Sequence, residues 1–269
     1  MDGKSLSTAY EAAWNPDHQP IPPADPWGRR GAYTTMLVEG RPPMAYFMDR
    51  HLRRLNDSIR HLGLHNPFPE TFLRGRIETA AANLAAPCML RMAIVEDGLF
   101  LTSYPQTGNG AELLGRPCRA RRKLPAAKSL LDTGLYQDLQ QVDRNCEELL
   151  LISEDQHVLE GGTTNLLLVQ GHRIHTPSLH TLPGITRQVI EENLPRGWSW
   201  APGNIHLDEL PGMDEILACG SGKEVARITR LEGIDWSPVS DRAFRSISQA
   251  YATAKNQYRD GTAQEDFQT

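Results

Sequence analysis

Short apolar runs that suit β-strands alternate with helical segments along this chain, and this alternation constrains its fold most strongly. Residues 32–39 and 89–103 are rich in the β-branched and apolar residues that strands favour. Between them, leucine and isoleucine recur at helical spacing over residues 48–64. In the second half of the chain, strands and helices alternate in a different pattern. The pattern therefore predicts a mixed α+β or α/β fold that is divided into two domains.

The pattern of strands and helices changes near residues 115–125, and this change predicts two domains. We expect a small N-terminal α/β domain over residues 1–118 and a larger C-terminal domain over residues 119–269. The proline-rich first thirty residues are expected to form an extended lead-in with turns. Asp49 is expected to cap the helix over residues 48–64, and residues 130–144 are expected to be helical.

Composition and charge exclude several classes of protein. The 269 residues have a net charge of −5, which argues against nucleic-acid binding. No run approaches the roughly 20 apolar residues of a membrane helix, and the N-terminus lacks a basic-then-apolar signal pattern. The four cysteines form no C-x-x-C pair, and no compact metal motif occurs. We therefore expect a cytoplasmic protein with reduced thiols, no metal site, and no membrane or nucleic-acid partner.

Two glycine turns are candidates for binding an anion. Residues 182–187 (LPGITR) place a glycine directly before a helix, whose free N–H groups and dipole attract negative charge. Residues 219–223 (CGSGK) follow an apolar strand, and their glycines allow backbone N–H groups to converge. Leu217 stands where a Walker A loop needs glycine, which excludes a nucleoside-triphosphate loop. Ordinary turns are the alternative at both places.

A carboxylate and a lysine complete the candidate chemistry. Glu160 stands at a strand end before two glycines, where it can face a flat ligand, although a simple β-bulge is the alternative. Lys128 follows the apolar residues 124–127. Partial burial disfavours an ammonium group, so this lysine can act as an amine nucleophile, unless it is a surface lysine. The chain offers few rivals, because it has only five lysines: Lys4, Lys123, Lys128, Lys223 and Lys255.

Taken together, these features resemble one family. From about residue 31 to residue 234, the motifs follow the order of the class IV (fold type IV) pyridoxal-phosphate enzymes. This family includes D-amino-acid and branched-chain aminotransferases, (R)-amine transaminases and aminodeoxychorismate lyase. The matching motifs are Arg54 within residues 51–55, Lys128, Glu160 with Asn165, residues 184–187 and residues 220–222.

The resemblance implies pyridoxal 5′-phosphate (PLP) as cofactor and Lys128 as the catalytic residue, which forms the Schiff base and moves a proton. It implies that Glu160 keeps the pyridine nitrogen protonated, which makes the ring an electron sink. Lys123 is the rival lysine, but its basic run over residues 121–123 suits a solvated or phosphate-steering face better. The implied phosphate ligands are Arg54, Ile185, Thr186, Ser221 and Gly222.

Three residues are candidates for binding the substrate. Tyr33 occupies the family's first-strand substrate motif, with packing in the core as the alternative. Arg91 lies in an otherwise apolar strand, where a buried arginine usually has an anionic partner; an exposed sheet face is the alternative. Arg30 is a further candidate for a substrate carboxylate.

The family resemblance leaves the reaction open. A transaminase acting on an amino acid or amine and a 2-oxo acid is favoured. An aminodeoxychorismate lyase is the alternative, supported by residues 33–35 (YTT), because many aminotransferases have an acidic residue where Thr34 stands. A cofactor-free member is the third hypothesis. Residues 129–133 match neither the transaminase nor the lyase pattern after the lysine. The resemblance also implies a homodimer.

Overall fold

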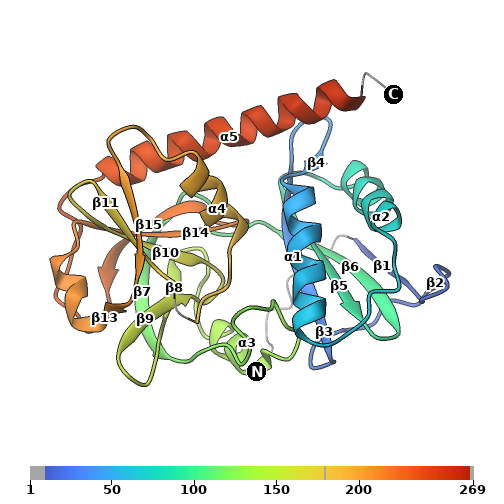
Figure 1. The fold of residues 1–269 in the computed structure, drawn as a ribbon, viewed down its shortest axis with the longest axis horizontal. Coiled ribbons are helices and arrows are strands. Elements are labelled where there is room, and N and C mark those ends of the chain that lie inside the picture. Colours follow the sequence, from blue (N-terminus) through green and yellow to red (C-terminus); the bar gives the residue numbers. More distant parts are fainter. Residues whose placement is uncertain (1–9, 179, 267–269) are drawn as a thin grey trace. The chain divides into compact units, whose positions relative to one another are not determined.

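The computed structural model describes residues 10–178 and 180–266, which divide into two compact units (Figure 1). Unit 1 contains the described residues up to Gln106 and the segment Ala126–Gly134, and unit 2 contains Thr107–Pro125 and the described residues from 135 onward. The predicted boundary after residue 118 lies inside strand β7 (Glu112–Arg119), which pairs in the sheet of unit 2. The chain thus re-enters unit 1 once, around Lys128.

Unit 1 is built on an antiparallel sheet with the strand order β2-β1-β6-β5-β3-β4. Its strands are β1 (Glu11–Trp14), β2 (Pro20–Ile21), β3 (Gly31–Glu39), β4 (Met44–Ala45), β5 (Cys88–Val95) and β6 (Gly98–Pro105). The predicted strand at residues 32–39 and the hairpin over residues 89–103 are confirmed. The lead-in prediction missed β1 and β2, which form because β1 finds its pairing partner in the distant strand β6.

Two helices complete unit 1, α1 (Met48–His61) and α2 (Glu70–Ala82). Helix α1 lies against β3 (Figure 1), and its leucine and isoleucine side chains enter the hydrophobic core, as their spacing predicts. The prediction that Asp49 caps α1 is wrong. Phe47 precedes the helix in a left-handed conformation (φ 55°) and no side chain caps it. Asp49 lies in the first turn instead and pairs with Arg74.

Unit 2 contains a nine-stranded mixed sheet with the order β12-β11-β10-β14-β15-β7-β8-β9-β13. Besides β7, its strands are β8 (Glu147–Ile152), β9 (His157–Gly161), β10 (Asn165–Gln170), β11 (Arg173–Pro177), β12 (Ser199–Gly203), β13 (Ile205–His206), β14 (Glu215–Gly220) and β15 (Glu224–Leu231). The strands at the two ends of this order, β12 and β13, are separated by Asn204 alone. The sheet therefore curves until its ends approach each other, and β11 contacts both β9 and β13.

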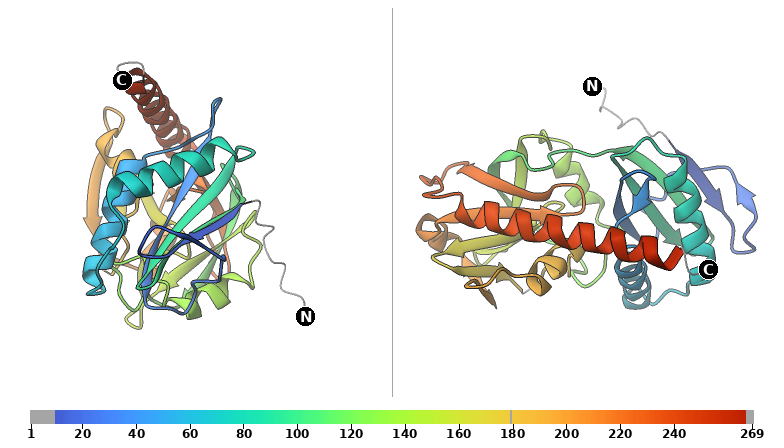
Figure 2. Two further views of the ribbon diagram at one scale, coloured as in Figure 1. Left: turned by 90° about the vertical axis from the view of Figure 1, so that its right-hand side faces the viewer. Right: turned by 90° about the horizontal axis from the view of Figure 1, so that it is seen from above.

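Helices α4 (Ile185–Glu192) and α5 (Arg242–Asp266) pack on the sheet of unit 2, with the short 3-10 helix η1 (Leu207–Gly212) at its curved end. Figure 2 shows α5 running along the sheet, where it contacts β14 and β15. The predicted helix over residues 130–144 is reduced to α3 (Thr133–Leu139). Its first residues pair with β3 instead, since Leu130 N donates to Gly31 O.

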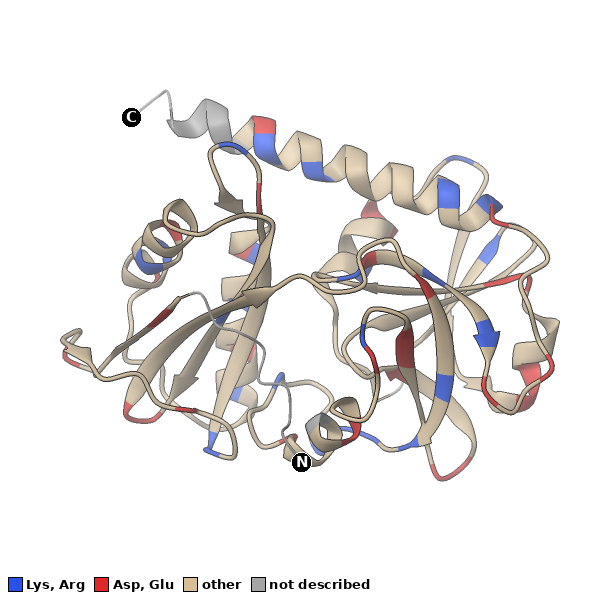
Figure 3. Cartoon of the chain, turned by 180° about the vertical axis from the view of Figure 1, so that it is seen from behind, with Lys and Arg blue, Asp and Glu red and all other residues tan. Residues whose placement is uncertain are grey.

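Charged side chains of both signs are interspersed over the described elements (Figure 3). Within residues 10–178 and 180–266, no helix is long and apolar enough to cross a membrane. The same residues hold no group of three or more His, Cys, Asp or Glu side chains suited to a metal ion. All four cysteines are free thiols.

Candidate active site

Lys128 is held by its backbone at the edge of β3 in unit 1. Its carbonyl oxygen accepts from Tyr33 N at 3.0 Å, and its own N–H donates to Ser58 Oγ at 3.1 Å. The next residue forms an antiparallel bridge to Ala32. Ser58 belongs to α1 and donates to the carbonyl oxygen of Arg54 at 2.8 Å. The strand and the helix together therefore fix where the side chain of Lys128 begins.

Two cationic side chains lie near the ring of Tyr33. Lys128 Nζ is 4.9 Å from the centroid of the Tyr33 ring, and Arg91 Cζ is 5.7 Å from it. The Arg91 guanidinium also contacts the rings of Trp27 and Tyr104, at 5.0 and 4.8 Å from their centroids. Tyr33 is only 3% exposed, so it is both a packed strand aromatic and a neighbour of the two predicted site residues. The packing of Tyr33 in the core is therefore confirmed, and its role toward substrate stays a prediction.

Arg54 approaches the opposite face of β3. Its Nη2 donates to Thr34 Oγ1 at 3.1 Å, and this oxygen lies 2.7 Å from His51 Nδ1. Thr34 and Tyr33 are adjacent in the strand, so their side chains point to opposite faces. Burial, followed by the charges of Arg54 and Lys128, lowers the pKa of His51 well below its ordinary value. His51, Arg54 and Ser58 therefore form one polar stripe on α1, as their spacing of three and four residues favours.

Arg30 is not part of this group. Its side chain is exposed, and its Nη2 donates to the carbonyl oxygen of Leu62 at 2.7 Å. Leu62 is the residue that ends α1. A cation at a helix C-terminus interacts favourably with the exposed carbonyl groups. This contact gives Arg30 a structural role, and its proposed role toward substrate stays a prediction.

Glu160 lies in unit 2 and has two well-placed donors. Arg122 Nε donates to Oε1 at 2.7 Å, and Leu182 N donates to Oε2 at 3.2 Å. The side chains of Arg122 and Glu160 are 2% and 3% exposed. The basic run over residues 121–123 is thus only partly a solvated face, since Arg121 and Lys123 are exposed but Arg122 is buried. Sequence reasoning missed this pair.

The hydrogen bond from Leu182 N to Glu160 holds the turn before α4 next to this carboxylate. Asn165 Nδ2 donates to the carbonyl oxygen of Leu182 at 2.9 Å. A Cβ atom on Gly184 would lie only 1.8 Å from Asn165 Oδ1, so glycine is required here. Gly184 precedes α4 without a side-chain cap, which leaves the N–H groups of Ile185 and Thr186 at the start of the helix without intrahelical partners.

The second glycine turn lies beside the first. Asn165 pairs with Cys219 between β10 and β14, directly before Ser221 and Gly222. The backbone near Gly220 touches Thr163 and Thr164, where an added Cβ would lie 3.2 Å from Thr163 O. Unit 2 therefore assembles Glu160, the start of α4 and the turn over residues 220–222 around the N-terminal end of β10.

A buried polar network supports these turns. Glu148 Oε1 accepts from Gly162 N and its Oε2 accepts from Thr164 Oγ1, both at 3.1 Å. Lys223 is 3% exposed and its Nζ donates to the carbonyl oxygen of Arg144 at 2.7 Å. Burial raises the pKa of Glu148 and lowers that of Lys223, while their mutual attraction opposes both shifts. Lys223 is thus a second partly desolvated amine.

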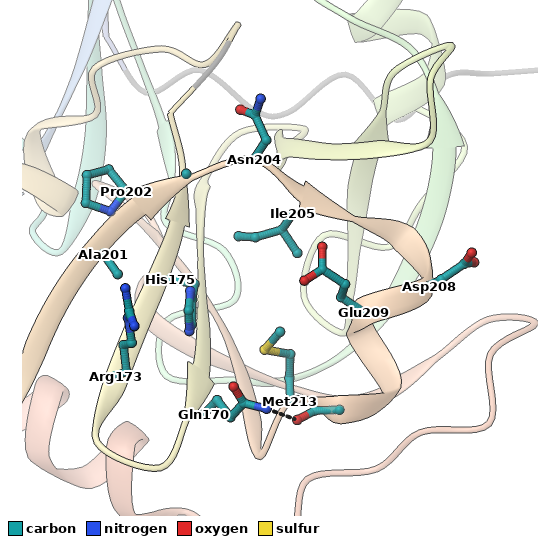
Figure 4. A pocket seen from close by; sticks show the side chains of 12 residues that line it. Gln170, Arg173, His175, Ala201, Pro202, Asn204, Ile205, Asp208, Glu209 and Met213 are labelled. Carbon is teal, nitrogen blue, oxygen red and sulfur yellow. Dashed lines mark hydrogen bonds between the residues drawn. The ribbon is translucent and has the colours of Figure 1, made fainter.

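A cavity of about 490 Å³ lies elsewhere in unit 2, where the curved sheet leaves a gap between β11, β12 and η1 (Figure 4). His175 and Arg173 line one side, and Glu209 faces them from η1. None of the residues predicted for the cofactor or the substrate lines it. The predicted chemistry therefore does not belong to this cavity.

Each unit by itself holds groups of the kind that PLP requires. Its phosphate needs cationic or N–H donors; unit 1 contains the cationic Arg54, and unit 2 contains the uncapped start of α4. The ring nitrogen needs a carboxylate kept free of water, and Glu160 is one. The aldehyde needs an amine, and Lys128 is the lysine that strand and helix both position. The residues present therefore fit the cofactor.

Comparison with known structures defines the fold. An aminotransferase from Mycobacterium tuberculosis, described as hypothetical and solved with α-ketoglutarate and PMP, superposes with a TM-score of 0.74. The match is 18% identical and covers 93% of this chain and 99% of that one. A fold IV transaminase from Curtobacterium pusillum superposes with a TM-score of 0.70 at 17% identity. The match covers 90% of this chain and 98% of that one. The expected fold type IV architecture is confirmed.

The family follows from the sequence match. Residues 31–231 match the family model of the class IV aminotransferases. The chain therefore belongs to the class IV aminotransferase family. A curated relative, aminodeoxychorismate lyase from Bacillus subtilis (strain 168), is 32% identical over 107 residues. That match covers 39% of this chain and only 36% of the lyase.

Proposed function

We propose that this protein is a PLP-dependent transaminase. It transfers an amino group between an amino acid of the D- or branched-chain type, or an amine, and a 2-oxo acid. The observation that carries the proposal is the setting of Lys128, whose backbone is bonded to both β3 and α1 beside Tyr33. Membership of the class IV family and the α-ketoglutarate-bound M. tuberculosis relative support the same reaction.

When bound, PLP supplies an electron sink that stabilises negative charge at the carbon next to the amino group. Lys128 Nζ would hold the cofactor and would move the proton from the donor's Cα. Glu160 would hold the ring nitrogen in its protonated form. Arg122 and the Leu182 amide hold the carboxylate of Glu160 in place for this role.

The phosphate is bound by Arg54 and by backbone N–H groups. These groups belong to Ile185 and Thr186 at the start of α4 and to Ser221 and Gly222 in the second turn. Negative charge is favoured at a helix start because N–H groups there lack partners and the helix dipole is positive. A side chain that capped the helix would compete with the phosphate for these N–H donors. Helix α4 has no side-chain cap.

The substrate carboxylate is bound by Arg91. Its Nε is buried without a hydrogen-bond acceptor among the described residues, and its guanidinium lies near three aromatic rings. Tyr33 lies near both this guanidinium and Lys128, so it would line the site beside the carboxylate and the reacting amine. Arg30 is the weaker candidate, because Leu62 already uses its guanidinium.

A lyase that converts 4-amino-4-deoxychorismate to 4-aminobenzoate and pyruvate is the second candidate. The observation that favours it is the 32% identity to the B. subtilis lyase. Thr34 also supports the lyase, because many aminotransferases have an acidic residue at this position. In both reactions Lys128 would take the proton from Cα. The two reactions therefore differ in the products that they release: a transaminase releases the carbonyl compound formed from its amino donor, and the lyase releases 4-aminobenzoate and pyruvate.

The visible spectrum of the purified protein tests the proposal. We expect a yellow band that D-alanine, L-leucine or (R)-1-phenylethylamine bleaches, with one equivalent of the matching carbonyl product released. A yellow protein that no donor bleaches, and that releases pyruvate from aminodeoxychorismate, would establish the lyase instead. A colourless protein that PLP cannot reconstitute would refute both functions.

A lysine substitution tests the assignment of the nucleophile. Lys128→Ala should abolish the covalent yellow band, and borohydride treatment of the wild type should fix the cofactor on the peptide that contains Lys128. Lys123→Ala is the matched control and should keep the band, because Lys123 is exposed. Labelling of Lys223, the buried amine, would show that Lys128 is the wrong residue.

The proposed assembly is a homodimer in the cytoplasm that binds only small molecules. It follows from the family resemblance. Light scattering of the purified chain should give twice the monomer mass of 30.0 kDa. A monomer with full activity would contradict the dimer without affecting the chemistry.

A further inference from the structure

We propose that Thr34 and His51 are positioning residues, which hold the guanidinium of Arg54 in the orientation that binds the cofactor phosphate. All three side chains lie in unit 1, on β3 and α1. The inference rests on the proposed function, because the role of Arg54 toward phosphate is part of that proposal.

The hydrogen bonds of these three side chains meet at Thr34 Oγ1. Arginine can only donate, so the oxygen of Thr34 accepts from Arg54 Nη2 at 3.1 Å. The hydroxyl hydrogen of Thr34 is then free to point to His51 Nδ1 at 2.7 Å. We assign Nδ1 as the acceptor of this hydrogen, which places the imidazole proton on Nε2. The three side chains thus form one ordered relay from Arg54 through Thr34 to His51.

Burial makes this relay rigid. Thr34 is fully buried and His51 is 1% exposed. His51 and Arg54 are three residues apart on α1 and so share a face of the helix. The lowered pKa of His51 keeps its ring neutral, which a relay that needs Nδ1 as an acceptor requires. A protonated ring would lose the acceptor and would repel the nearby guanidinium.

Positioning differs from packing in a measurable way. Valine has nearly the shape of threonine, so Thr34→Val keeps the volume and removes only the hydroxyl. If Thr34 only fills the core, this change lowers stability and leaves cofactor preference unchanged. If Thr34 orients Arg54, the change weakens binding of a ligand that carries a phosphate and spares one that lacks it.

The experiment titrates the full-length apoprotein with PLP and, separately, with pyridoxal, which lacks the phosphate. Affinities are read from absorbance without any turnover. We expect Thr34→Val to bind PLP about tenfold more weakly, since hydrogen bonds to charged groups are the strong ones, and to bind pyridoxal as the wild type does. Thr34→Ser restores the hydroxyl and should restore PLP affinity.

Thr176→Val is the matched control. Thr176 is also a buried strand threonine with one hydroxyl hydrogen bond, to Leu166 O at 3.2 Å, but it lies in unit 2. It should lose stability and keep the wild-type ratio of PLP to pyridoxal affinity. His51→Asn, which offers an acceptor oxygen, should stay near the wild type, whereas His51→Leu should reproduce Thr34→Val. The His51 pair keeps the test decisive if Thr34→Val does not fold.

A third arm separates this inference from the proposed function. Arg54→Met should lower the PLP to pyridoxal ratio more than any other variant. If it does so while Thr34→Val and His51→Leu match the wild type, the positioning role is refuted and the phosphate role of Arg54 stands. If Arg54→Met leaves the ratio unchanged, Arg54 does not bind the phosphate and both statements fail.

Discussion

Replacing Arg122 with methionine should be among the most damaging single changes in unit 2. The Arg122 and Glu160 side chains are 2% and 3% exposed and meet at 2.7 Å. Methionine keeps much of the volume but removes the charged partner of a buried carboxylate, whose Oε2 still accepts from the Leu182 amide. Removing one partner of a buried ion pair costs about 3–5 kcal/mol. At roughly 2–4 °C per kcal/mol, the melting temperature should fall by about 10 °C.

Thermal unfolding by calorimetry measures this loss. Arg245→Met is the control, because Arg245 pairs with Asp241 at 2.6 Å but is 76% exposed, and exposed pairs contribute little. The double variant Arg122→Met with Glu160→Gln should recover most of the loss, since no buried charge remains. If Arg122→Met melts no earlier than Arg245→Met, the pair does not stabilise the unit and the reasoning fails.

Two further changes test other parts of the site. Gly184→Ala should cost about 1–3 kcal/mol and weaken PLP binding, because the new methyl group would lie 1.8 Å from Asn165 Oδ1; Gly134→Ala, which meets open space, is the calorimetric control, and equal melting of the two would contradict the clash. The lowered pKa of His51 means that the folded chain binds fewer protons than the unfolded chain below pH 6.5. Its free energy of unfolding should therefore fall as pH drops from 6.5 to 5, by at most about 1.4 kcal/mol per pH unit. Urea titrations of His51→Asn should show a shallower slope, and an unchanged slope would mean that His51 titrates normally.

Local spacing was enough to predict much of unit 1. The positions of His51, Arg54 and Ser58 on one helical stripe follow from a period of 3.6 residues, and all three meet β3 or Lys128 in the structure. The glycine turns before α4 and after β14 were also visible, because glycine marks places where a side chain cannot fit. Gly184 shows this directly through its contact with Asn165.

Long-range partners were not predictable from local patterns. Arg122 has exposed neighbours on both sides, and only a carboxylate 38 residues later explains its burial. Strand β1 is stabilised by β6, more than eighty residues away, so a proline-rich lead-in concealed it. The residues after Lys128 suit a helix by composition, yet their backbone groups pair with β3. In each case a distant partner outweighs local propensity.

The strands that end the two sheets have a consequence for assembly. Within residues 10–178 and 180–266, the terminal strands β2, β4 and β13 are two residues long. The fourth, β12, carries Pro202, which has no N–H to donate. Short or proline-containing borders resist recruitment of another chain's backbone. If two copies associate, these borders favour recognition through side-chain surfaces over a sheet continued from one copy into the next.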